Sequence, residues 1–148
     1  QALAWTAFQA FNDGPLLLYA GQEAEETRTP SLFDSDKVRW GGYELQSYLT
    51  RLCQLKKDAV LVNGRFTLLT PEPAITALWQ AENEGLYGVF NVSGVVEVQP
   101  TPLPDGEYED VLSGTAVPVR DGAMAVPDTA VILRFSGVLA QVGPKIWL

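Results

Sequence analysis

Hydrophobic and polar positions divide the chain into two parts near residue 59. Before that point, apolar residues recur at helical spacing within residues 2–11 and again within residues 43–57. Between these two predicted helices, residues 16–20 (Leu-Leu-Leu-Tyr-Ala) form an uninterrupted apolar run. A strand with one face in solvent alternates apolar and polar residues, so this run predicts a strand that is covered on both faces, as in a parallel sheet wrapped by helices.

After residue 59 the pattern changes to short β-type runs separated by Gly, Pro, Asn and Asp. The predicted strands are residues 60–62, 65–69, 74–80, 86–92, 95–98, 108–112, 116–119, 123–126 and 131–135. Strands so closely spaced indicate an antiparallel sandwich or barrel. Asn63-Gly64 and Asp121-Gly122 are strong hairpin signals. The expected fold is therefore α+β, with a helix–strand–helix unit in residues 1–58 and an all-β sandwich domain in residues 59–148.

The apolar run ends in Gly21-Gln22-Glu23, which is the first candidate site. Polar groups at the carboxyl end of a buried strand are where α/β enzymes bind substrate. Gly21 allows the chain to turn sharply there because it has no Cβ. Glu23 is expected either to order the neighbouring loops or to contact substrate.

Residues 21–42 carry no periodic pattern, and a long irregular stretch inside a compact domain is usually functional. Phe33, Asp34, Arg39 and Trp40 are candidates for a sugar subsite, with aromatic faces stacking on the sugar and charged groups holding hydroxyls. The alternative is a loop fixed by the two aromatic side chains and by an ion pair between the two charged ones.

Composition excludes several classes of chemistry. The formal net charge of −8 leaves no basic stripe for nucleic acid. The sequence has no histidine and only one cysteine, Cys53, so it offers no Ser-His-Asp or Cys-His catalysis, no intrachain disulfide and no cysteine-ligated zinc. No apolar stretch reaches the roughly 20 residues that span a membrane. The cellular compartment stays open.

The order of these parts resembles the C-terminal third of α-amylase-family (family 13) glycoside hydrolases. The matching features are the Gly-Pro-Leu…Tyr-x-Gly-x-Glu run at residues 14–23, Phe33-Asp34 and Trp40, the leucine-rich helix ending at Lys56-Lys57, and Gly64-Arg65-Phe66-x-Leu68-Leu69. Residues 108–114 (Tyr-Glu-Asp-Val-Leu-Ser-Gly) resemble a motif of the family's C-terminal sandwich. In residues 14–23 the proline follows Gly14 directly, one residue short of the family's usual spacing.

The resemblance implies that residues 1–58 are the last helix–strand–helix of a (β/α)8 barrel that acts on α-glucans. The family's catalytic carboxylates lie on earlier barrel strands, before Gln1, and none can be assigned to a residue of this chain. The chain alone is therefore expected to be inactive and to hold no cofactor or metal. Calcium binding is expected, if at all, only in the intact enzyme. Glu23 with Glu25 and Asp34 with Asp36 are the local carboxylate pairs, which are expected to be solvated rather than catalytic.

Two other functions are compatible with the sequence, namely a carbohydrate-binding module and a protein-interaction module, both without catalysis. Trp79, Tyr87, Phe90 and Phe66 are expected to be core residues rather than sugar platforms. Without neighbouring barrel strands, residues 16–20 would expose apolar surface whose burial is worth on the order of 5–10 kcal/mol. We therefore expect this segment to pair with its twin in a second copy or to fold onto the sandwich.

Overall fold

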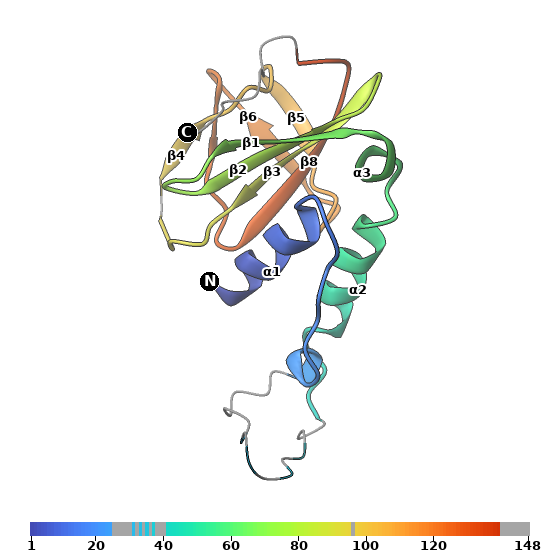
Figure 1. The fold of residues 1–148 in the computed structure, drawn as a ribbon. Helices are drawn as coiled ribbons and strands as arrows, with labels where there is room; N and C mark the ends of the chain where they lie inside the picture. The colour runs from blue at the N-terminus through green and yellow to red at the C-terminus, as the bar shows by residue number, and fades with distance from the viewer. Residues whose placement is uncertain are drawn as a thin grey trace, which may run out of the picture.

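A computed structural model describes residues 1–24, 31, 33, 35, 37, 41–95 and 97–139. Three α-helices precede the strands: α1 (Ala2–Phe11), α2 (Gln46–Leu55) and the short α3 (Ala59–Asn63). A 3-10 turn, η1 (Gln22–Ala24), follows α1 and precedes α2. In Figure 1, α1 and α2 lie beneath the strands, and α3 lies beside the sheet at the level of the strands.

The main sheet is antiparallel and has the strand order β1-β2-β3-β8. Its strands are β1 (Arg65–Thr70), β2 (Ile75–Gln80), β3 (Glu84–Phe90) and β8 (Ala130–Ser136). Two short antiparallel ribbons complete the sandwich: β4 (Val98–Pro100) with β7 (Ala123–Ala125), and β5 (Gly106–Glu109) with β6 (Ala116–Val119). Of the strands predicted after residue 64, each is found within a few residues of its expected position.

Both faces of the main sheet are buried. Alternate residues of β2, β3 and β8, such as Trp79, Leu86 and Ile132, belong to a core shared with the helices, here called the helix-side core. The intervening residues, such as Leu78, Tyr87 and Leu133, belong to a ribbon-side core that includes residues of β6 and β7. This alternation between two cores explains why the central strands carry apolar residues at nearly every position.

Helix α1 joins the sheet through aromatic contacts. Phe11 is fully buried, and its ring centroid lies 5.4 Å from that of Phe90 in β3. The close approach requires Gly88, where a Cβ would lie 2.6 Å from Phe90 and 3.2 Å from Phe11. The helix-side core thus contains residues from both sides of the expected boundary at residue 58. The division into two domains at that position stays a prediction.

Residues 16–20 do not form a strand in this chain, contrary to the prediction. Leu17 is 82% exposed and Tyr19 70% exposed, while Leu16 and Leu18 are half-buried against the helix-side core. No described strand pairs with either edge of the segment. Without partner strands, only the face of the segment that carries Leu16 and Leu18 is partly buried, and the opposite face is exposed to solvent.

Two local predictions after residue 58 were also wrong. Residues 60–62 lie in α3 rather than in a strand, because Asp58 caps this helix by accepting a hydrogen bond from the Val60 backbone N–H at 2.9 Å. Asn63-Gly64 ends α3, with the Gly64 N–H donating to the Val60 carbonyl, and is not a hairpin turn. Asp58 also forms an ion pair with Arg134 of β8, which fixes α3 against the main sheet.

Other local predictions were confirmed. Asp121-Gly122 forms the turn between β6 and β7, with φ values of 53° and 69°. The helix predicted at residues 2–11 is α1, and the helix predicted at 43–57 is α2, shorter at both ends. Asn91, just after β3, is buried and holds its loop together: its amide donates to the carbonyls of Val95 and Pro127 and accepts from the N–H groups of Gly94 and Val95.

Candidate functional site

Gly21, Gln22 and Glu23 form a compact turn, referred to below as the Gly-Gln-Glu turn. Gly21 has a φ of 93°, a backbone conformation that favours glycine. The Gln22 N–H donates to the Tyr19 carbonyl at 3.0 Å, and the Gln22 side chain accepts from the Tyr19 N–H at 3.3 Å. The Glu23 carboxylate accepts from the Gly21 N–H at 3.1 Å. In this chain the Glu23 carboxylate therefore stabilises its own turn, and its role toward neighbouring loops or substrate stays a prediction.

Thr6 of α1 anchors this turn. The Gln22 side-chain amide donates to the Thr6 hydroxyl at 3.1 Å, and that hydroxyl donates to the Ala2 carbonyl at 3.1 Å. The chain thus returns alongside α1, so that residue 22 lies beside residue 6. Sequence reasoning missed Thr6, since a threonine in an alanine-rich helix gives no signal of a partner 16 residues away.

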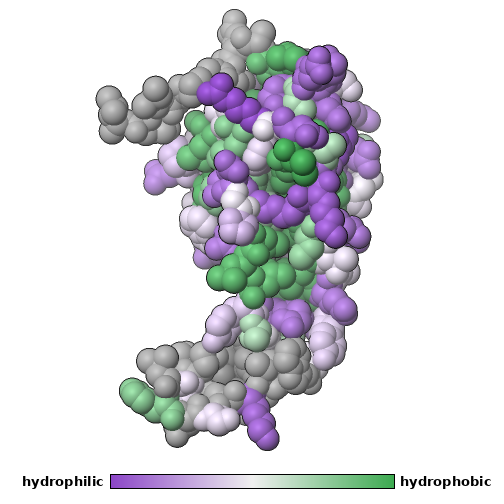
Figure 2. Space-filling view, turned by 45° about the vertical axis from the view of Figure 1, so that its right-hand side comes forward, coloured by the Kyte–Doolittle hydropathy of each residue, from purple (hydrophilic) through white to green (hydrophobic). Residues whose placement is uncertain are grey.

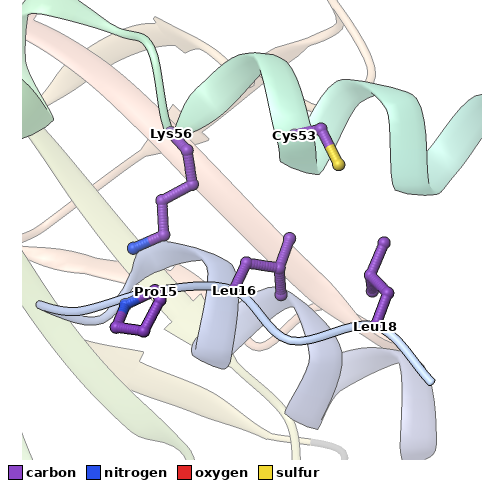
Figure 3. Close-up of a pocket in the computed structure, with 5 residues that line it drawn as sticks. All are labelled: Pro15, Leu16, Leu18, Cys53 and Lys56. Carbon is purple, nitrogen blue, oxygen red and sulfur yellow. The ribbon is translucent and has the colours of Figure 1, made fainter.

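A groove lies between residues 15–23 and α2 (Figure 3). It consists of two adjoining hollows of about 430 Å³ and about 370 Å³ that share Leu18 and Cys53. Leu16 and Leu18 face Cys53 across the first hollow, and Lys56 extends from the end of α2 toward Pro15. Glu23 lines the second hollow. The groove is thus mainly apolar, with a cation near one end and a carboxylate near the other.

The groups around the groove are mostly engaged with the backbone. Lys56 Nζ donates to the Asn12 carbonyl at 2.6 Å; burial lowers the pKa of this ammonium group, and the nearby Asp13 carboxylate opposes that shift. Tyr48 of α2 donates to the Leu3 carbonyl at 3.4 Å. Burial, assisted by the negative charge of Asp110, raises the pKa of Tyr48 to about 12. These groups bind main-chain carbonyls and therefore serve the fold.

The remaining predicted site residues are not assembled with the turn in the part of the chain that the structure describes. Phe33 is 94% exposed, and its N–H donates to the Ser31 hydroxyl at 3.2 Å. Asp34, Arg39 and Trp40 lie outside the described residues, as do Glu25 and Asp36 of the local carboxylate pairs. The sugar subsite and its alternative both stay predictions.

The aromatic residues of the sandwich behave as core, as predicted. Trp79, Tyr87 and Phe90 are at most 5% exposed. Phe66 is half-buried, with its ring 5.4 Å from that of Trp79. The Trp79 indole N–H donates to the Phe11 carbonyl at 2.5 Å, a contact that joins β2 to the end of α1.

Asp110 is a further buried polar group. Its carboxylate accepts from the N–H groups of Leu112, Ser113 and Ile132 and from the Ser113 hydroxyl, at distances of 2.5–3.1 Å. The Asp-x-x-Ser-Gly pattern at residues 110–114 is a turn signal that points to this role. Asp110 thus connects the loop after β5 to β8 and has no free acceptor turned toward a ligand.

No described helix is long and apolar enough to cross a membrane. No group of three or more His, Cys, Asp or Glu side chains lies together in a way that would hold a metal ion, within the same described part of the chain.

Comparison with known families and structures identifies the sandwich. Residues 67–133 match the model of the bacterial α-amylase C-terminal domain. A comparison with curated protein sequences finds no match.

Three solved structures of α-amylases resemble the chain. An α-amylase from Lactobacillus plantarum is 23% identical, with a TM-score of 0.74 over 91% of this chain and 34% of its own. A noncanonic maltogenic α-amylase from Thermotoga neapolitana is 20% identical, with a TM-score of 0.77 over 91% of this chain and 36% of its own. An Anoxybacillus α-amylase is 25% identical, with a TM-score of 0.52 over 72% of this chain and 24% of its own. The chain spans about a third or less of their length.

The structural similarity extends beyond the sandwich. Coverage of 91% of a 148-residue chain cannot be reached within residues 67–133, so the shared fold includes most of the helical part that precedes β1. The family resemblance predicted from the sequence is confirmed: residues 67–133 match the model of the bacterial α-amylase C-terminal domain, and the chain shares its fold with part of the solved α-amylases.

Proposed function

We propose that this chain is the C-terminal segment of an α-amylase-type glycoside hydrolase acting on α-glucans, in which the sandwich stabilises the catalytic barrel. The observation that carries the proposal is the family match at residues 67–133 together with the shared fold over 91% of the chain, including the helices before the sandwich. In this proposal residues 1–58 are the last helix–strand–helix of the barrel.

The exposed side of residues 16–20 supports a barrel as the missing neighbour. Leu17 and Tyr19 point away from the helix-side core, and the segment pairs with no described strand. Neighbouring barrel strands would provide backbone partners and would cover these side chains, at about 1.5–3 kcal/mol for each large apolar residue. The strand predicted from the sequence would then form once the barrel is complete.

Catalysis in this proposal belongs to carboxylates in the preceding part of the enzyme. Glycoside hydrolysis uses two carboxyl groups placed on either side of the scissile bond. Glu23 is the described carboxylate of the candidate site, and it accepts a hydrogen bond from its own turn. The chain alone is therefore expected not to hydrolyse α-glucans.

The binding-module alternative is less well supported. Trp79, Tyr87 and Phe90 are buried and provide no stacking surface for a sugar. Titration of the chain with maltooligosaccharides, followed by tryptophan fluorescence, is expected to give a flat response through millimolar ligand. A saturable change would favour the binding module.

The experiment that tests the proposal begins with the coding sequence upstream of Gln1. We expect a barrel with three catalytic carboxylates, and a full-length protein that releases reducing sugars from soluble starch. The same protein cut before Arg65 should lose thermal stability and soluble yield, because the main sheet no longer covers α1. An upstream sequence without a barrel, or starch hydrolysis by the 148-residue chain alone, would contradict the proposal.

A further inference from the structure

The sandwich contacts residues 12–23 by more than apolar packing. Trp79 lies in the middle of the main sheet, yet its indole N–H donates to the carbonyl of Phe11, the last residue of α1. This bond is buried, and it acts where α1 ends and the chain turns toward residues 16–20. A carbonyl at a helix C-terminus has no partner within the helix, so a side-chain donor there fixes the direction in which the chain leaves.

A second donor acts on the next residue. Lys56, at the end of α2, donates to the Asn12 carbonyl at 2.6 Å. Two successive carbonyls, of Phe11 and Asn12, are therefore bound by side chains from two different elements. The backbone at this corner is fixed from the sheet and from α2 together.

The far end of residues 12–23 is fixed as well. The Gln22 side chain donates to Thr6 of α1, and Leu16 and Leu18 pack on the helix-side core between the two ends. Since α1 itself lies on β3 and β8, the bonds made by Trp79 and Thr6 connect residues 12–23 to the main sheet, and the bond made by Lys56 connects them to α2.

From these contacts we infer that Trp79 is a positioning residue: through the Phe11 carbonyl, and together with Lys56, it sets the place of residues 12–23 and hence of the Gly-Gln-Glu turn. The consequence for substrate rests on the proposed function, in which this turn lies on the substrate side of the barrel. The sandwich then acts on the site by fixing the last barrel strand in place, in addition to covering the barrel.

The 148-residue chain itself offers the test. Trp79→Phe removes the indole N–H and keeps an aromatic ring beside Phe66. We expect amide exchange at Asn12, Tyr19 and Gln22 to become about three- to tenfold faster, the effect of losing one hydrogen bond, while amides of β3 and β8 change much less. Trp5→Phe is the matched control, since Trp5 is half-exposed on α1 and lies outside the corner.

Cys53 provides an independent readout. It is the sole cysteine in the sequence and faces Leu16 and Leu18 across the groove. Cys53 is exposed at the groove, so displacement of Leu16 and Leu18 in the Trp79→Phe variant should change the rate of its alkylation by iodoacetamide. In the Trp5→Phe control the rate should stay the same.

Lys56→Met tests the second donor and keeps the inference falsifiable if Trp79→Phe fails to fold. The methionine retains an apolar stem and removes the ammonium group, and exchange at residues 12–23 should again rise locally. Lys57→Met, at an exposed neighbouring lysine, should leave it unchanged.

Two results would overturn the inference. Equal acceleration at residues 12–23 and in β3 and β8 would mean that Trp79 supports only global stability. Unchanged exchange at residues 12–23 in both variants would mean that neither donor sets the corner. Both results are obtained without a barrel, so they are independent of the starch-hydrolysis test of the proposed function.

Discussion

Strand β3 and residues 16–20 both carry large apolar side chains on two faces of the backbone, but they lie in opposite surroundings. In β3, Leu86 and Phe90 contact the helices, while Tyr87 and Val89 contact the ribbons. In residues 16–20, Leu16 and Leu18 are half-buried and Leu17 and Tyr19 face outward. An uninterrupted apolar run therefore indicates that both faces of a backbone need cover, and the cover itself comes from elsewhere in the fold.

The difference is visible on the molecular surface. Figure 2 shows an apolar area at the level of α1 and α2, below the sandwich. Large apolar side chains with high exposure in this part of the chain include Leu17, Tyr19 and Trp5. The central strands of the sandwich bury their large apolar side chains, whereas the helical part leaves several of its own exposed.

The largest expected effect contrasts the two runs directly. Leu86→Ala should lower the free energy of unfolding by about 2–5 kcal/mol, because it leaves a cavity between sheet and helices. Leu17→Ala should change it by less than about 0.5 kcal/mol, since Leu17 is mostly in solvent. Urea unfolding followed by tryptophan fluorescence measures both. Equal losses would mean that residues 16–20 are buried in solution.

The second effect concerns the helix-side contacts at alkaline pH. The pKa of Tyr48 is raised to about 12 in the fold from its ordinary value of 10.0. The folded state thus holds this proton more tightly than the unfolded state, and stability is lost as pH rises from about 10 toward about 12. Because Tyr48 is only partly buried and solvent screens part of the effect, the loss attributable to it is roughly 1–2 kcal/mol.

Tyr48→Phe should remove that part of the pH dependence in urea unfolding, and Tyr19→Phe, at an exposed ring, serves as the control. An unchanged alkaline slope in Tyr48→Phe would show that the phenol is not buried between α1 and α2.

A third effect lies on the ribbon side. Asp110→Asn keeps one acceptor but replaces the other oxygen by a donor, which faces N–H groups. We expect a loss of about 1–3 kcal/mol in unfolding free energy. Glu107→Gln, which weakens an exposed ion pair with Arg120, should change stability by less than about 0.5 kcal/mol. An equal loss of unfolding free energy in the two variants would show that the buried hydrogen bonds of Asp110 stabilise the fold no more than an exposed ion pair does.

The smallest effect on stability comes from the exposed side of residues 16–20, where the consequence is association. We propose that the isolated chain self-associates through this segment, because its outward side chains and strand edge lack a partner among the described strands. Sedimentation should show a concentration-dependent dimer, and Leu17→Lys should give a monomer of nearly unchanged stability. A monomer at all concentrations would contradict self-association.

Local signals in the sequence predicted much of this fold. The spacing of apolar residues predicted α1. Asp121-Gly122 predicted a turn, because Asp and Gly readily adopt the positive φ values that this turn needs. The short helix α3 was missed because its Ala-Val-Leu-Val sequence favours a strand, whereas the deciding signal was the cap at Asp58.

The candidate site was predicted less completely, because its determinants are far apart in the sequence. The bonds from Gln22 to Thr6 and from Trp79 to Phe11 join residues separated by 16 and 68 positions. No local pattern in the sequence encodes such pairings. Residues 16–20 show the same limit, since their pattern correctly indicates a need for cover but not whether this chain supplies it.

The loop held by Asn91 has a consequence for producing the protein. Asn91-Val92-Ser93 has the Asn-x-Ser pattern that eukaryotic secretory cells glycosylate. In the folded chain the amide nitrogen of Asn91 is buried and donates to two carbonyls, so a glycan can be attached only before folding. A glycan on this nitrogen would prevent the loop from closing. Expression hosts that do not glycosylate avoid that modification, and so does a Ser93→Ala variant, which removes the pattern and keeps the Asn91 amide.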